Sequence, residues 1–134
     1  MTTRLFVDTS AWVALANRAE TAHGAVSALL QAPGVRLVTS SFVFDETVTL
    51  CRMRLGHPVA LRVGAVLRGD AVDLVHVTPE DLAEAWVLFA ARADQAYSFT
   101  DCTSFVLMRR LRLETAAALD ADFAREGFRV VPAA

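Results

Sequence analysis

Short apolar runs alternate along the chain with longer segments of helical periodicity. In these longer segments hydrophobic residues recur every three or four positions, as in amphipathic helices. The predicted helices are Ser10–Arg18, Ala22–Gln31, Phe42–Leu55, Pro58–Arg68, Pro79–Ala93 and Thr100–Leu113. The predicted strands are Leu5–Val7, Arg36–Thr39, Asp73–Val77, Thr115–Leu119 and Phe128–Val131. This alternation predicts an α/β fold with a mostly parallel central sheet that is flanked by helices on both faces.

No linker, charge block or internal repeat divides the 134 residues, so we expect a single domain over residues 1–134. Hydrophobic residues make up 54% of the chain, which excludes an intrinsically disordered protein. Cys51 and Cys102 have no metal-binding spacing, and we interpret them as buried thiols. Asp8 interrupts the first apolar run, and no stretch reaches the roughly twenty apolar residues that span a bilayer. We therefore expect a cytoplasmic protein with no membrane partner.

The charged residues restrict the possible chemistry. Thirteen basic residues oppose fifteen acidic ones, which gives a net charge of -2, and every basic residue is an arginine. A P-loop enzyme and a Schiff-base enzyme both require a lysine, so both classes are excluded. The acidic balance by itself argues against a generic nucleic-acid-binding protein, because such proteins normally carry a basic surface.

Three aspartates stand where a parallel sheet places its functional sites, outside the carboxyl ends of the strands or in the helices that face them. Asp8 and Asp120 each directly follow a predicted strand. Asp101 lies in the first turn of a predicted helix, at the head of a stripe that includes Ser104. Each aspartate has a structural alternative, because Asp is common as a helix cap and in first turns.

Glu46 is harder to explain as a cap. It has the helical spacing of Phe42, Leu50 and Met53, so we expect it on the apolar side of its helix. Its neighbour Asp45 falls on the polar side. A carboxylate on a buried face needs a compensating cation, a proton or a metal. Carboxylates that converge without His or Cys suit Mg²⁺ or Mn²⁺, and such ions commonly serve phosphoryl chemistry.

Four segments together resemble a PIN-domain ribonuclease of the VapC toxin type. They are Leu5–Trp12, Phe44–Thr47, Tyr97–Phe105 and Leu119–Phe123, in the family's order and over essentially the whole chain. The resemblance implies a PIN-like fold and Mg²⁺-dependent endonucleolytic cleavage of RNA by a metal-activated water. It also implies the toxin role in a bacterial type II toxin–antitoxin pair.

The resemblance also implies site roles. Asp8 and Asp101 would be the principal metal ligands, and Glu46 and Asp120 would complete the catalytic site.

The same resemblance gives supporting roles to Ser10, Thr100, Ser104 and Asp122. One position departs from the family pattern, because Ala118 stands where Thr or Ser is frequent.

Two groups of arginines follow the acidic motifs on their helices. Arg109, Arg110 and Arg112 are candidate RNA contacts, and Arg52 and Arg54 follow Glu46. The alternative is a solvated helix end, where the helix dipole favours cations.

The expected partners are an RNA substrate, a cognate antitoxin and a second copy in a homodimer. Two other functions stay open: a catalytically inactive PIN-like protein-binding module, and a metal-dependent phosphoesterase that acts on small substrates.

Overall fold

Five parallel strands form one sheet in the order β3-β2-β1-β4-β5 in the computed structural model, which describes residues 2–133. The strands are β1 (Thr3–Val7), β2 (Val35–Ser40), β3 (Val72–Val75), β4 (Thr115–Ala117) and β5 (Arg129–Val131). β1 is central, since Phe6 is in register with Val38 of β2 on one side and with Ala116 of β4 on the other. The predicted parallel sheet is confirmed. The strand order reverses between β1 and β4, because the chain adds β2 and β3 on one side of β1 and then β4 and β5 on the other.

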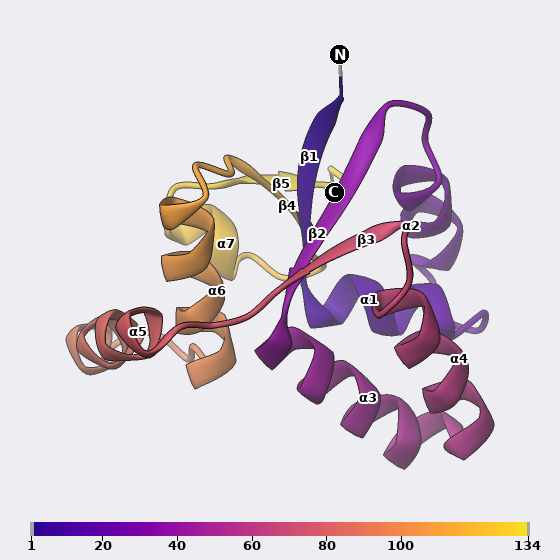
Figure 1. Ribbon diagram of the computed structural model, residues 1–134, viewed down its shortest axis with the longest axis horizontal. Helices are drawn as coiled ribbons and strands as arrows, with labels where there is room; N and C mark the ends of the chain where they lie inside the picture. Colours follow the sequence, from indigo (N-terminus) through magenta and orange to yellow (C-terminus); the bar gives the residue numbers. More distant parts are fainter. Residues whose placement is uncertain (1, 134) are drawn as a thin grey trace.

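Within the described residues, seven helices connect the strands and cover both faces of the sheet. They are α1 (Thr9–Ala16), α2 (His23–Leu30), α3 (Ser41–Leu55), α4 (His57–Leu67), α5 (Pro79–Ala91), α6 (Phe99–Arg110) and α7 (Asp122–Arg125). Figure 1 shows α5, α6 and α7 on one side of the strands and α2 and α4 on the other. The two sides follow from right-handed crossovers, because the connections before and after β3 run in opposite directions across the sheet.

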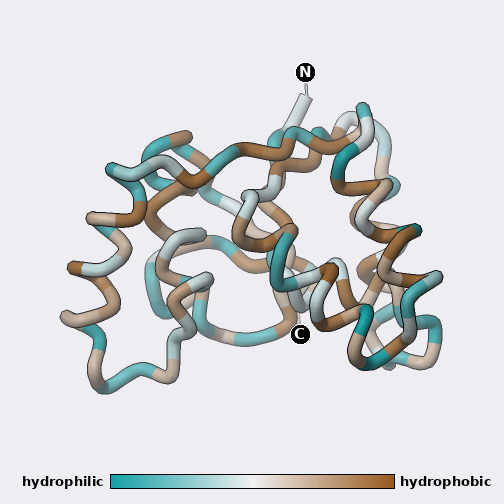
Figure 2. Tube along the Cα trace, turned by 60° about the horizontal axis from the view of Figure 1, so that its bottom comes forward, coloured by the Kyte–Doolittle hydropathy of each residue, from teal (hydrophilic) through white to brown (hydrophobic). Residues whose placement is uncertain are grey.

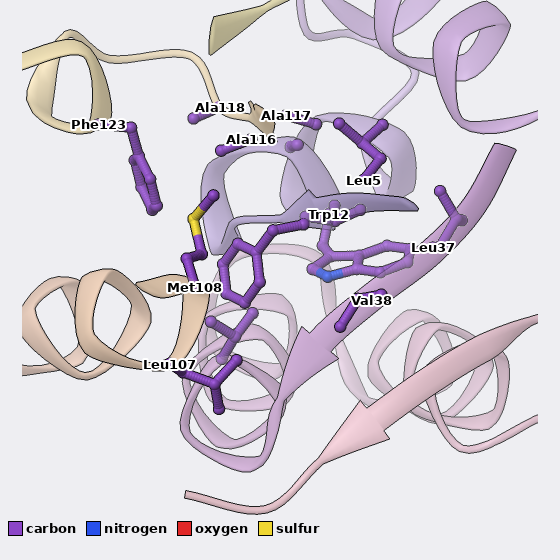
Figure 3. Close-up of a cluster of buried hydrophobic side chains, with 14 of the residues drawn as sticks. Leu5, Trp12, Leu37, Val38, Leu107, Met108, Ala116, Ala117, Ala118 and Phe123 are labelled. Atoms are coloured by element: carbon purple, nitrogen blue, oxygen red, sulfur yellow. The ribbon is translucent and has the colours of Figure 1, made fainter. Parts of the chain in front are cut away.

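The core lies between the sheet and these helices. Figure 3 shows side chains of β1, β2, α1 and α6 meeting there, with the Trp12 indole set against β2. Trp12 is fully buried, and its Nε1–H donates to Oγ1 of Thr39, whose hydroxyl donates in turn to the carbonyl of Val7. In Figure 2 the apolar colour concentrates along the central strands, while the helices alternate between apolar and polar turns. The buried polar atoms of Trp12 and Thr39 are paired across β1 and β2.

The helix predicted over Thr100–Leu113 ends earlier, at Arg110. Arg112 adopts a left-handed backbone (φ 56°), and the amide of Leu113 donates back to the carbonyl of Met108 at 2.8 Å. This is a Schellman ending, which usually carries a glycine at the position of Arg112. α7 was not predicted, because four residues are too few for a periodic signal.

None of the helices within residues 2–133 is long and apolar enough to cross a bilayer. The one-domain organisation of residues 1–134 stays a prediction.

Candidate active site

Asp8 lies where β1 ends and is the N-cap residue of α1. It is only 3% exposed. Its Oδ2 atom accepts hydrogen bonds from the Ser10 hydroxyl (2.8 Å) and the Ser10 amide (3.3 Å), while its own amide donates to the carbonyl of Ala117 at the end of β4. Burial, together with the negative charges of Asp101 and Asp120, raises the pKa of Asp8 to about 7 against the opposing effect of the bonds from Ser10. A buried carboxylate with this pKa lacks a cation partner.

Asp101 approaches the same place from the first turn of α6. Ser98 and Asp101 form a capping box: the Ser98 amide donates to Oδ2 of Asp101 (2.9 Å), and the Asp101 amide donates to the Ser98 hydroxyl (3.0 Å). Burial, together with the charge of Asp120, raises the pKa of Asp101 to about 6 against the opposing effect of the bonds from Ser98. The cap therefore fixes one carboxylate oxygen of Asp101.

The four predicted catalytic acids line one pocket of about 370 Å³: Asp8, Glu46, Asp101 and Asp120. Asp8 and Asp120 follow β1 and β4, which are neighbours in the sheet, so both acids emerge where the strand order reverses. This is where open α/β sheets bind ligands. Glu46 reaches the pocket from α3, and Asp101 reaches it from α6.

Glu46 is positioned differently from the expectation. The buried stripe of α3 is Val43, Thr47 and Cys51, whereas Met53 is 76% exposed. The expected apolar face through Met53 was therefore wrong, because the helix packs on the core through the neighbouring stripe. Glu46 and Leu50 border the acidic pocket from a half-buried position.

The predicted supporting residues divide into two groups. Ser10 lines the pocket, and its hydroxyl also accepts the Leu119 amide at 3.0 Å. This bond ties the chain after β4 to α1 at the place where Ala118 itself offers no hydroxyl. Thr100 is half-buried outside the pocket lining, and Ser104 is fully buried with an unpaired hydroxyl.

Asp122 also lies outside the pocket lining and pairs with another side chain. Its carboxylate accepts from Arg125 at 2.8 Å, and its amide donates to Oδ1 of Asp120 at 3.0 Å. Burial raises the pKa of Asp122, the charge of Asp120 adds to this, and Arg125 opposes it. Asp122 therefore helps to hold Asp120 at the start of α7.

The candidate RNA-binding arginines are not part of the pocket. Arg110 makes two hydrogen bonds to Asp81 (2.8 and 2.9 Å), and Arg109 bonds to Glu126 (3.1 Å). Both lie at the opposite end of α6 from Asp101, and Arg112 follows that end. Arg109 and Arg110 therefore form structural ion pairs that lie away from the carboxylates of the pocket. Contact of these arginines with RNA elsewhere stays a prediction.

Eight residues line the pocket in addition to the five predicted site residues, and four of the eight are polar: Thr9, Glu20, Arg54 and Ser98. The Ser-x-x-Asp spacing of Ser98 and Asp101 is a capping-box signal that is readable from the sequence. Glu20 carried no such signal, and Arg54 was noted only as one of two arginines that follow Glu46 on its helix.

The donor chemistry of the pocket fits a divalent cation. It offers carboxylate oxygens from several chain segments and no His or Cys, the ligand set that Mg²⁺ and Mn²⁺ prefer. Residues 2–133 hold no group of three or more such side chains already arranged around one point. The pKa values of Asp8 and Asp101 are raised because negative charge is desolvated there without a counterion. A bound cation would supply that counterion.

This fold and this pocket define an α/β hydrolytic domain with a carboxylate site at the carboxyl ends of its strands. The chain belongs to the PIN-domain family, whose domain matches residues 5–128. The 23S rRNA-specific endonuclease VapC20 of Mycobacterium tuberculosis is 37% identical over 124 residues, which cover 92% of this chain and 95% of that protein. Ribonuclease VapC26 of the same organism is 31% identical over 116 residues, covering 87% and 86% of the two chains.

Solved structures agree with the family. The crystal structure of M. tuberculosis VapC20, described as a Sarcin-Ricin loop cleaving toxin, matches with a TM-score of 0.87 over 92% of this chain and 95% of that one. VapBC2 of Rickettsia felis, bound to a DNA fragment from its promoter, matches with a TM-score of 0.71 at 11% identity over 96% and 97% of the chains, and shows the fold alone. The predicted PIN-like fold and the predicted PIN-domain ribonuclease class of VapC type are therefore confirmed. PIN-domain nucleases generally depend on a divalent metal ion.

Proposed function

We propose that the acidic pocket hydrolyses RNA phosphodiester bonds with Mg²⁺, and that Asp8 and Asp101 hold the ion. Mn²⁺ would support the same reaction. The observation that carries this proposal is that the buried Asp8 and the half-buried Asp101 line one pocket with raised pKa values and no cationic partner. A divalent ion bound there would polarise the phosphate and lower the pKa of a bound water.

The chain's own residues would divide the remaining work. Ser10 and Ser98 orient the carboxylates of Asp8 and Asp101 through the hydrogen bonds described above. Glu46 and Asp120 border the same pocket and would hold waters or accept a proton as the phosphodiester is attacked. No step requires a lysine, in agreement with a chain whose basic residues are all arginines.

The test is cleavage of a labelled RNA with Mg²⁺, with EDTA, and with EDTA followed by excess Mg²⁺. We expect cleavage, its loss, and its return. Cleavage that persists in EDTA would contradict the metal dependence. Hydrolysis of a phosphate monoester without cleavage of RNA would favour the small-molecule phosphoesterase. A chain without either activity would favour the inactive protein-binding module.

For the substrate we propose ribosomal RNA. The support is 37% identity over almost the whole chain to a relative named as a 23S rRNA-specific endonuclease. Sequencing of new 5′ ends after intact ribosomes and total RNA are treated with the enzyme would test it. One dominant site in 23S rRNA is expected, and cleavage spread over many messenger RNAs would contradict this choice.

The proposed protein partner is a cognate antitoxin, and we place it in a second pocket of about 650 Å³. This groove is lined by apolar residues of α1 and α4, with Arg18 and Arg62 beside them, which suits an amphipathic helix with acidic residues. Val66→Asp should weaken binding of the antitoxin encoded beside this gene. Leu61→Asp is the control, since Leu61 is on α4 outside the groove lining.

The homodimer and the cytoplasmic location also stay proposals. The surface that we propose for the dimer is the aromatic face of α5, where Trp86 (62% exposed) and Phe89 (40% exposed) lie beside Phe99. Exposed apolar patches of this kind commonly mark association surfaces, and a two-fold dimer is the commonest assembly.

A further inference from the structure

The wall of the acidic pocket contains a single basic residue among those that the structure describes, Arg54 in the last turn of α3. Arg54 follows Glu46 and Leu50 at four-residue steps, so these three side chains form one stripe along the pocket. Helical side chains lean toward the N-terminus of their helix, which directs the Arg54 side chain back toward Leu50 and Glu46. Its position in the pocket wall therefore follows from the register of α3.

Arg54 has no carboxylate partner within residues 2–133. The ion pairs within the described residues are made by other arginines: Arg36, Arg92, Arg109, Arg110 and Arg125. Two acids of the same pocket, Glu20 and Glu46, do not form an ion pair with Arg54 either. An exposed guanidinium with its donors free, beside several carboxylates, is available for an anion that enters the pocket.

An RNA strand that enters a pocket of carboxylates meets electrostatic repulsion. A metal ion would offset this repulsion only at the phosphate that it contacts, and the neighbouring phosphates still face the acids. A guanidinium is the side chain best suited to bind a phosphate there, because its planar donors match two phosphate oxygens and it stays charged at all physiological pH values.

On the basis of the ribonuclease function proposed above, we propose that Arg54 binds an RNA backbone phosphate next to the one that is cleaved. The RNA strand then runs from the Asp8–Asp101 end of the pocket along the Glu46–Leu50–Arg54 stripe of α3. Arg54 is a substrate-binding residue in this assignment, and it discriminates a nucleic-acid chain from a small phosphate ester, which has no second phosphate to offer.

Arg52 provides a matched control. It is exposed on the same helix and carries the same charge, but it lies outside the pocket lining. Two residues correspond to roughly 200° around a helix, so Arg52 points away from the stripe. Arg54→Gln and Arg52→Gln change the net charge equally, and any difference between them reports position rather than total charge.

The experiment measures binding of a single-stranded RNA oligonucleotide in EDTA at several salt concentrations, and cleavage of the same RNA in Mg²⁺. For Arg54→Gln we expect about tenfold weaker binding, and a slope of log affinity against log salt that is smaller by about 0.7. The KM should rise more than kcat falls. Arg54→Lys should recover part of the affinity, and Arg52→Gln should stay within about twofold of the wild type.

The assignment would be overturned if Arg54→Gln and Arg52→Gln had equal effects, or if Arg54→Gln left the salt slope unchanged. In either case, cleavage by the wild type would still support the ribonuclease function. A wild-type chain that neither binds nor cleaves RNA would instead overturn the proposed function, and the assignment with it. Circular dichroism melts of all variants check that each is folded. If Arg54→Gln does not fold, Arg54→Lys still allows the assignment to be tested.

Discussion

The Ser10 hydroxyl donates a 2.8 Å hydrogen bond to Oδ2 of Asp8 and accepts a 3.0 Å bond from the amide of Leu119. One hydroxyl group thus joins the carboxylate after β1 to the chain that leaves β4 and carries Asp120. The two strands are neighbours in the sheet, so this contact sets how the two acids face each other.

We expect Ser10→Ala to separate these two acids. The amide of Leu119 loses its acceptor and Asp8 loses a donor, so the free energy of unfolding should fall by about 1–2 kcal/mol. RNA cleavage should fall by about tenfold or more, because the acids are no longer held in register. Urea unfolding and single-turnover cleavage measure the two effects.

Ser27→Ala is the control for this prediction, because it also removes a serine that hydrogen-bonds a side chain, Gln31, but on α2. Its cleavage rate should match the wild type. If Ser10→Ala cleaves RNA as fast as Ser27→Ala does, the positioning role of Ser10 is wrong.

The raised pKa of Asp8 predicts a pH-dependent stability without metal. The pKa rises from an ordinary 3.8 to about 7 on folding, so the folded chain keeps a proton that the unfolded chain releases in this range. Stability is therefore favoured below pH 4 and is lost as the pH rises toward 7, by up to about 4 kcal/mol from this one group.

Asp8→Asn removes this titration and should make the metal-free protein more stable at pH 7. The measurement is the unfolding free energy of both proteins in EDTA between pH 4 and pH 8. A difference that widens toward pH 7 is expected. Parallel curves over the whole range would show that Asp8 titrates normally.

Glu126 is predicted to stabilise the segment that precedes Asp101. Its side chain is 4% exposed and accepts bonds from Arg92 (2.9 Å), Tyr97 (3.0 Å) and Arg109 (3.1 Å). Burial raises the pKa of Glu126, but these three donors outweigh burial and lower it overall, so the stabilisation is complete above pH 4.5 and is lost at lower pH. Glu126→Gln should cost about 1–3 kcal/mol at pH 7.

Glu114→Gln is the matched control for Glu126→Gln, because Glu114 is exposed and forms no side-chain ion pair within the described residues. Thermal unfolding at pH 7 and pH 4 compares the two variants. A loss for Glu126→Gln that is as large at pH 4 as at pH 7 would contradict an ionised carboxylate at this position.

The aromatic face of α5 predicts a homodimer that depends on Trp86. Trp86→Ser should shift the protein toward monomer in light scattering, because it removes the largest exposed apolar side chain of this face. Leu61→Ser is the control, since Leu61 is also 62% exposed but lies on α4. A monomeric wild type, or equal effects of both variants, would contradict this surface.

Periodicity was sufficient to predict the strands and most helices, because the core residues of this fold recur at regular spacing. It also predicted the acids of the pocket, since Asp8 and Asp120 follow β-like runs directly. The end of α6 was missed because Arg112 takes a left-handed conformation that the sequence signals only when glycine is present.

Long-range pairing could not be predicted. The pairing of Arg110 with Asp81 and of Arg109 with Glu126 joins residues that are 29 and 17 positions apart, and only the packed fold brings them together. The same limit concealed the placement of Arg54 in the pocket wall. Local patterns report helix faces, whereas the partner of an exposed charge depends on which elements meet.

Cleavage of an end-labelled RNA in Mg²⁺ by four proteins tests the central claim most directly: wild type, Asp8→Asn, Asp101→Asn and the control Asp94→Asn, whose side chain is exposed outside the pocket. We expect the wild type and Asp94→Asn to cleave at equal rates, and the two pocket variants to be slower by about 100-fold or more. Undiminished cleavage by both Asp8→Asn and Asp101→Asn would contradict the carboxylate site.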